Sequence, residues 1–255
     1  MLKHLFTITM VLLCHTLSAQ QHKEKRSGVF YFSFGSHRAF YTPGDIRFVS
    51  NAKPSFDFTL ENVKGRDDGG IRWKTSPQYS YNIGYYSRTG NFGIEYQFDH
   101  VKYTMVQGQV ARMKGIIGEN HYDTDTVLHR DFVKLEHTDG ANYAMLNFVK
   151  WKNLATGKKQ HRSLDLVLKA GGGIVVPKTN SIIMGKHNDD RYAISGFVLG
   201  VEPGIRYNFL KNFFAFAGFK GAYANYSHFR IADGYGSQQW FSMQFNLMLG
   251  VQVGR

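Results

Sequence analysis

The chain is poor in cysteine and proline, and it lacks long apolar runs beyond its first residues. Cys14 is the only cysteine among 255 residues, so a chain that loses its N-terminus by processing carries no thiol. Such a chain has no disulfides, no thiolate metal ligands and no cysteine nucleophile. Prolines number only five, and no later stretch of about 18 apolar residues occurs, which excludes a membrane-spanning helix.

The N-terminus has the three parts of a secretory signal peptide. A basic start at Lys3 and His4 precedes an apolar run from Leu5 to Leu13, and small residues end the segment at Ala19. We therefore predict a signal peptide at residues 1–19 and one mature domain at residues 20–255. Cys14 follows two leucines where a lipoprotein signal needs a small residue, so we do not expect lipidation.

Composition favours strands over helices and an anionic partner over a neutral one. Aromatic residues make up 15% of the chain and glycines number 27, which is typical of strands joined by tight turns. The net charge of +12 suits anionic lipid head groups or polysaccharide in an exported protein. Lysines and arginines are scattered without a recognition motif, so we expect no nucleic-acid partner. The triplet Gly171-Gly172-Gly173 opens no helix, and we expect no cofactor.

The last strand-like segment, Trp240 to Val253, has one apolar and one polar face. Successive side chains of a strand point to opposite faces, and a rise of about 3.3 Å per residue makes this segment long enough to cross a bilayer. A tilted membrane strand needs only about 9–11 residues, and its polar face then lines a closed lumen. The apolar face holds Phe241, Met243, Phe245, Leu247, Leu249, Val251 and Val253.

The same alternation recurs along the chain, and the connections alternate in length. Short connections are expected at 88–91, 153–161 and 208–212, and long ones at 106–140, 176–192 and 227–237. This asymmetry is typical of outer-membrane barrels. We predict an all-β fold: a closed antiparallel transmembrane β-barrel of eight strands, with long loops on one end. The count becomes ten if segments 45–49 and 56–60 join the wall instead of forming a hairpin in a long loop.

Charged residues of both signs fall on the face predicted to point inward. They are expected to pair as a polar plug, with a conducting path as the alternative. A soluble barrel of lipocalin type, with its apolar face inside, is the architectural alternative. The predicted inward charges are Glu95, Asp99, Lys150, Asp165, Lys169, Glu202, Arg206 and Lys220.

The most suggestive chemical cluster joins two segments that an antiparallel pairing of 91–105 with 141–153 brings together. Asp99 and His100 end one strand, and His137 and Asp139 lie where the chain returns. A carboxylate beside a histidine supplies a general base, and the four side chains together could ligate a metal. The alternative is that they cap the loops through hydrogen bonds. Ser227 and His228, with Asp233 nearby, supply a possible serine nucleophile and base. Adjacent residues of a strand point to opposite faces, so polar loop residues are the favoured interpretation.

Basic residues near the first long connection are candidates for lipopolysaccharide contact. Arg38, His37, Arg47 and Lys53 could meet phosphate groups at an anionic leaflet. A solvated loop is the alternative interpretation.

Together with the leader and the strands, two segments carry a family resemblance. They are Glu136-His137-Thr138-Asp139-Gly140-Ala141-Asn142-Tyr143 and Gly171-Gly172-Gly173-Ile174-Val175-Val176-Pro177-Lys178-Thr179-Asn180. The chain resembles small, largely uncharacterised outer-membrane β-barrel proteins of Gram-negative bacteria. The resemblance implies fold and location and no catalytic residue. The C-terminus departs from such barrels, because its outward phase ends on Arg255 instead of an aromatic residue.

The sequence thus predicts an integral outer-membrane barrel with both termini in the periplasm. Its expected role is structural or surface-binding, with lipopolysaccharide or an extracellular partner as ligand and outer-membrane lipid around it. The barrel-assembly machinery would contact it during insertion. One alternative is an outer-membrane lipid-modifying hydrolase that uses Asp99, His100, His137 and Asp139, and another is a narrow channel. Whether the protein is an enzyme is left open.

Overall fold

The fold comes from a computed structural model that describes residues 28–67, 78–87, 91–158, 161–189 and 191–254. The predicted signal peptide and most of the predicted turn at 88–91 lie outside the described residues. Every regular element in the described part is a strand. No helix there is long and apolar enough to span a membrane.

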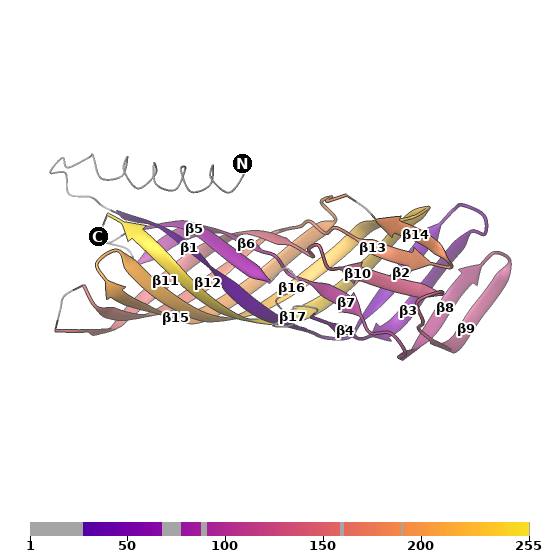
Figure 1. The fold of residues 1–255 in the computed structure, drawn as a ribbon, viewed down its shortest axis with the longest axis horizontal. Coiled ribbons are helices and arrows are strands. Elements are labelled where there is room, and N and C mark those ends of the chain that lie inside the picture. The colour runs from indigo at the N-terminus through magenta and orange to yellow at the C-terminus, as the bar shows by residue number, and fades with distance from the viewer. Residues whose placement is uncertain (1–27, 68–77, 88–90, 159–160, 190, 255) are drawn as a thin grey trace, which may run out of the picture.

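Eight antiparallel strands form a closed wall (Figure 1). The last strand pairs with the first, from Phe30 opposite Val253 to Tyr41 opposite Ser242, which closes the barrel. The prediction of eight strands is therefore confirmed, and the ten-strand alternative is wrong. In order around the wall, the strands are β1 (Gly28–Tyr41), β5 (Tyr79–Ser87), β6 (Phe92–Asp99), β11 (Tyr143–Thr156), β12 (Ser163–Val175), β15 (Gly196–Leu210), β16 (Phe213–Ile231) and β17 (Gly234–Val253).

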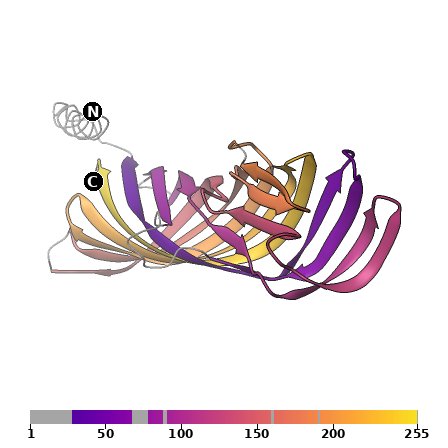
Figure 2. The same ribbon diagram turned by 45° about the vertical axis from the view of Figure 1, so that its right-hand side comes forward.

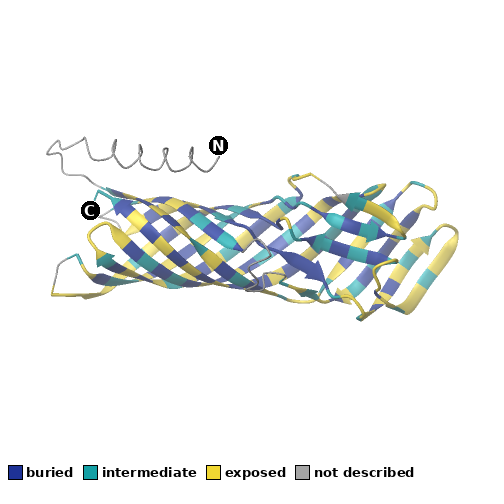
Figure 3. Cartoon of the chain, in the orientation of Figure 1, coloured by how far each residue is buried: buried dark blue, intermediate teal, exposed yellow. Residues whose placement is uncertain are grey.

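Buried and exposed residues alternate along the wall strands (Figure 3), and most of the large exposed side chains between the two ends are apolar. On β17, Phe241, Phe245 and Leu249 are exposed while Gln244 and Asn246 are buried. This polarity confirms the predicted apolar exterior and overturns the lipocalin alternative. Other exposed wall residues are Phe30, Phe32, Phe34, Ile83, Ile94, Leu146, Phe148, Leu166, Leu168, Leu199, Val201 and Phe219.

The predicted set of inward charges needs one correction. Lys150 is exposed on the outside of β11, because it shares the parity of the outward-facing Leu146 and Phe148. Asp165 is half-buried. The remaining six predicted inward charges are buried: Glu95, Asp99, Lys169, Glu202, Arg206 and Lys220.

The two ends of the barrel differ as expected. Gly28 and Gly254, the ends of the described chain on the N- and C-terminal sides, lie at the same end as the short connections after β5, β11 and β15 (Figure 1). We call this the terminal end. The long connections lie at the opposite end, called the loop end. The prediction of a long loop at 227–237 is wrong, because β16 and β17 continue into this region and leave only Ala232 and Asp233 between them.

The other two long connections, and the segment between β1 and β5, contain nine strands of their own, here called the loop domain. One group extends the wall sheet outward from the start of β17, in the order β2 (Gly44–Ser50), β3 (Phe56–Val63), β8 (Val110–Ile117) and β9 (Asn120–Val127). Figure 2 shows these four strands projecting beyond the barrel. The second group is a separate sheet in the order β14 (Lys186–Asp189), β13 (Asn180–Ile183), β10 (Val133–His137), β7 (Tyr103–Met105) and β4 (Gly65–Arg66).

A hydrophobic core lies between the loop domain and the mouth of the barrel. It includes Phe48 and Phe58 of the extension, Leu135 of the second sheet and Trp240 of the wall, all at most 2% exposed. The Tyr103 ring stacks on that of Trp240, with centroids 4.6 Å apart. The long connections are therefore packed against the wall, and apolar side chains fill the loop end of the barrel.

Candidate functional site

Ion pairs fill the middle of the barrel. Lys169 Nζ lies 2.9 Å from Glu95 Oε1 and 3.4 Å from Glu202 Oε2. Tyr31 donates a hydrogen bond of 2.7 Å to the other oxygen of Glu95, and Asn246 donates one of 2.5 Å to Glu202. Both carboxylates thus have a charged partner and a further hydrogen bond, which a buried ion pair requires. This arrangement is the polar plug predicted from the sequence.

A second buried network lies nearer the loop end. The Lys220 ammonium contacts the Asp99 carboxylate, and both side chains are at most 1% exposed. Ser80 donates a hydrogen bond of 2.6 Å to Asp99, and His37 Nδ1 lies 2.9 Å from the Ser80 hydroxyl. The side chains of His37, Ser80 and Asp99 thus form a continuous chain of polar contacts. Because all are buried inside the wall, a large substrate has no access to them.

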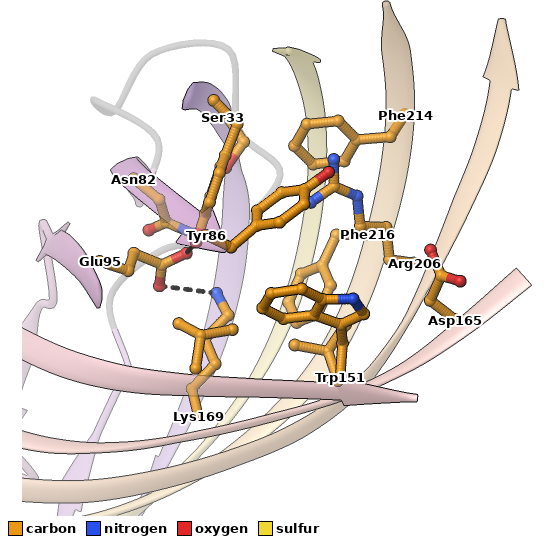
Figure 4. A pocket seen from close by; sticks show the side chains of 13 residues that line it. Ser33, Asn82, Tyr86, Glu95, Trp151, Asp165, Lys169, Arg206, Phe214 and Phe216 are labelled. Carbon is orange, nitrogen blue, oxygen red and sulfur yellow. Dashed lines mark hydrogen bonds and ion pairs between the residues drawn. The ribbon is translucent and has the colours of Figure 1, made fainter. Parts of the chain in front are cut away.

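A small cavity opens below these networks, toward the terminal end (Figure 4). Its volume is about 40 Å³, enough for only a few waters. The Arg206 guanidinium lies 3.6 Å from the centre of the Phe214 ring and also faces Tyr31 and Tyr86. Arg206 further donates a hydrogen bond to Gln252. The cavity is thus lined by aromatic rings and by charged groups of both signs that already have partners.

The four residues predicted as a catalytic or metal-binding set occupy different surroundings. Asp99 lies inside the wall, with Lys220 and Ser80 as partners. His100 follows the end of β6, where its ring stacks on Tyr79 and its Nδ1 lies 2.9 Å from the Asn142 side-chain oxygen. The expected pairing of these two segments is confirmed, since Asp99 lies opposite Tyr143 in the β6–β11 ladder.

His137 and Asp139 differ in burial although they are only two positions apart in the sequence. His137 is fully buried, stacks on Tyr226 and lies 3.1 Å from the Thr179 hydroxyl through its Nδ1. Burial lowers the pKa of His137 to about 3, so its imidazole is neutral. Asp139 is exposed and pairs with Lys178. Within the described ranges, no group of three or more His, Asp, Glu or Cys side chains has the spacing of a metal site.

The basic residues near the first long connection also differ in exposure. His37 points inward and is buried, and Arg47 is bonded to Asp57 on the neighbouring strand at 2.6 Å. Arg38 is half-buried and Lys53 is exposed between β2 and β3. Arg38 and Lys53 therefore keep the exposure that the predicted lipopolysaccharide contact needs.

The most accessible regular element of the loop domain is the β8–β9 hairpin. β9 pairs with β8 and with no other described strand, so it forms an open edge of the sheet. Ion pairs cross the exposed face of this sheet from strand to strand. They join Arg112 of β8 to Asp123 of β9, Lys114 of β8 to Glu61 of β3, and Arg47 of β2 to Asp57 of β3.

The turn and register of this hairpin fix which backbone groups of β9 are unpaired. Gly118 has a φ of +61° at the first turn position, and Ile117 lies opposite Asn120 across a two-residue loop. In such a hairpin the closing pair exchanges hydrogen bonds, and every second pair after it does so again. Tyr122 and Thr124 therefore bond to β8, whereas the N–H and C=O groups of His121, Asp123 and Asp125 point away from it.

Sequence reasoning missed the aromatic core of the loop end and the open edge. Tyr103, Tyr226 and Trp240 are at most 2% exposed and surround His137. Tyr226 and Trp240 lie on the inward face of β16 and β17, where alternation predicts polar side chains, and Tyr103 lies in a strand of only three residues. The β8–β9 hairpin has a detectable signal. Gly118-Glu119 is a turn dipeptide, and charges recur at every second position on both sides of it, as Arg112 and Lys114 before and Asp123 and Asp125 after.

No protein-family model and no curated protein sequence matches the chain. Among solved structures, the chain is similar to the outer membrane protein OprG from Pseudomonas aeruginosa, with 9% identity and a TM-score of 0.39 over 90% of this chain and 97% of that one. It is also similar to Neisserial surface protein A, with 11% identity and a TM-score of 0.37 over 87% and 96% of the two chains. A third similar structure is Ail of Yersinia pestis in complex with the heparin analogue sucrose octasulfate, at 13% identity and a TM-score of 0.33 over 89% and 99%.

Proposed function

We propose that this chain is an integral outer-membrane β-barrel that holds the loop domain outside the cell and binds an extracellular polypeptide along the open edge of β9. The membrane location is supported by the exposed apolar belt around the wall and by the polar, ion-paired interior. Closed barrels satisfy all backbone hydrogen bonds within the membrane. The orientation follows outer-membrane barrels in general, whose short turns face the periplasm and whose long loops face outward.

The observation that carries the binding role is the folded loop domain itself. A membrane anchor needs only the eight wall strands. Here nine further strands are present, most of them contribute side chains to one core with the barrel mouth, and β9 lies at the open edge of the sheet. Unpaired backbone groups of an edge strand accept an additional strand from another chain, and that chain's backbone supplies the hydrogen bonds.

Charge argues for a different chain as the added strand, not a second copy. Asp123 and Asp125 are exposed side chains on one face of β9. Antiparallel pairing of two β9 strands about their centre would bring the acidic residues of both copies together, and like charges opposite each other are destabilising. An extended segment carrying lysine or arginine at alternate positions fits this edge.

Photo-crosslinking on intact cells tests the proposal. A benzophenone amino acid at position His121 should give a light-dependent adduct with a partner polypeptide, and the same probe at Lys53 should not. Adding Asp123→Pro should abolish the adduct, because proline removes an outward-facing N–H. The matched change Asp123→Asn keeps that N–H and should retain the adduct.

Three results would contradict the proposal. One is equal labelling from positions His121 and Lys53, which indicates random collision. Another is an adduct with the mass of two copies of this chain, which indicates self-pairing. The third is an adduct that survives Asp123→Pro, which indicates binding through side chains instead of the strand edge.

A further inference from the structure

The terminal end of the barrel carries a patch of exposed cations, here called the basic rim. Its members lie on the β11–β12 hairpin and in the neighbouring β15–β16 turn: Lys150, Lys152, Lys158, Arg162 and Lys211. The only described carboxylate close to them in the strand register is Asp165, which is half-buried and accepts a hydrogen bond of 2.8 Å from Asn208. The basic rim therefore has a strong local excess of positive charge.

The basic rim differs in its pairing from several cations of the loop domain. In the loop domain, Arg47, Lys114 and Lys186 each lie within 3.0 Å of a carboxylate. Among the described residues, no ion pair involves Lys152, Lys158, Arg162 or Lys211. These four cations thus form a local excess of positive charge, and such an excess attracts an external anion.

The basic rim lies next to the apolar belt of the wall, and this position indicates that the external anion is a lipid head group. Along the outward face of β11, Leu146 and Phe148 are 59% and 74% exposed, and Lys150 and Lys152 follow at the next two outward positions. The strand thus changes from lipid-facing apolar side chains to cations within a few residues. Lysines at such a boundary extend their ammonium groups to the level of lipid head groups.

The hairpin continues past this boundary and carries Lys158 and Arg162 farther toward the terminal end. The β6–β11 ladder ends at Lys150, where the Trp151 N–H still donates a hydrogen bond of 3.2 Å to the Asn91 carbonyl, and from residue 152 onward β11 pairs with β12 alone. The Gly157 N–H donates a hydrogen bond of 2.9 Å to the Arg162 carbonyl and closes the hairpin. Arg162 precedes Ser163, which lies opposite Asn208 of β15, the strand whose turn carries Lys211.

We infer that the basic rim is a binding site for anionic glycerophospholipid head groups of the periplasmic leaflet. The leaflet assignment rests on the proposed orientation in the outer membrane, whereas the lipid preference is a property of the folded protein in any membrane mimic. Removing several basic residues near an anionic surface weakens such binding steeply.

Native mass spectrometry of the folded, detergent-solubilised full chain tests the inference. We expect phosphatidylglycerol adducts to persist at activation energies that strip phosphatidylcholine. The triple variant Lys152→Gln, Lys158→Gln and Arg162→Gln should lower the affinity for phosphatidylglycerol by about tenfold or more. The matched control Lys53→Gln, Lys64→Gln and Arg130→Gln removes the same charge from the loop end and should leave adduct formation unchanged.

The outcomes distinguish a failure of the lipid site from a failure of the proposed membrane orientation. Equal retention of the two lipids, or equal loss in both triple variants, would overturn the site. Competition by millimolar inorganic phosphate alone would show a phosphate site and not a lipid site. The protein could instead cosediment with purified peptidoglycan in a way that depends on the three cations, without selective lipid adducts. That result would show that the basic rim binds the cell wall and not lipid. If lipid selectivity holds but surface labelling finds this end outside the cell, the orientation fails and the lipid site stands.

Discussion

At the scale of single residues, the interior of this barrel is stabilised by charges that depend on one another. Lys220 and Asp99 are almost fully buried, whereas Arg47 and Asp57 form a pair of similar geometry about half-exposed on the loop domain. Removing one partner of a buried pair leaves an uncompensated charge in a low-dielectric interior. The same change at the surface leaves a solvated one.

We therefore expect Lys220→Met to lower the free energy of unfolding by about 3–5 kcal/mol. Arg47→Met should lower it by less than about 1 kcal/mol. Urea titration of both variants in lipid vesicles, followed by tryptophan fluorescence, measures the difference. Similar losses in the two variants would contradict the view that the interior charges depend on pairing.

His137 makes the stability of the loop domain depend on pH, and the sign of this dependence follows from the direction of its pKa shift. Its pKa is lowered to about 3 by burial, whereas an unfolded histidine titrates near 6.5. The unfolded chain therefore binds the extra proton first, so stability is fully present above about pH 6.5 and is lost as pH falls toward 3, by about 1.4 kcal/mol per pH unit.

Between pH 7 and pH 5, the wild-type protein should lose about 2 kcal/mol more stability than His137→Gln. The control His187→Gln alters an exposed histidine of β14 and should keep the wild-type slope. Unfolding midpoints at the two pH values measure this. Parallel profiles for wild type and His137→Gln would show that His137 is not buried as a neutral ring.

At the scale of elements, period-two alternation was sufficient to predict the wall, because a strand between lipid and a polar lumen has opposite requirements on its two faces. β17 shows this most clearly. The loop domain could not be predicted in the same way. Its strands are short and its core mixes buried residues from separate segments, such as Leu60, Tyr103, Leu135 and Phe229. The four proposed site residues do not share one environment for a related reason, since neighbours in sequence such as His137 and Asp139 differ completely in burial.

The glycines of β12 show how closely two wall strands approach. A Cβ added to Gly173 would lie 1.9 Å from the Ala144 carbonyl oxygen of β11, whereas one added to Gly221 of β16 would meet nothing within 4 Å. We expect Gly173→Ala to destabilise the barrel by about 1–3 kcal/mol through overpacking, and Gly221→Ala to have little effect. Heat-modifiable electrophoretic mobility and urea unfolding report both. Equal stability of the two variants would contradict the close approach of β11 and β12.

At the scale of the whole molecule, the two ends of the barrel differ in structure and in charge. The loop end is a packed β-sheet domain whose surface charges are largely paired and whose distal strand is open. The terminal end is short and basic. Ion pairs and apolar packing fill the space between them, and the proposed function makes the barrel an anchor with two distinct surfaces.

The most direct test of this account is cysteine labelling on intact cells, since the described chain contains no cysteine. Thr124→Cys on β9 and Lys158→Cys on the β11–β12 hairpin are treated with a membrane-impermeant maleimide. We predict that position 124 is labelled on intact cells and that position 158 is labelled only after the outer membrane is permeabilised. Labelling in the reverse order, or recovery of the protein in the soluble periplasmic fraction, would contradict the account.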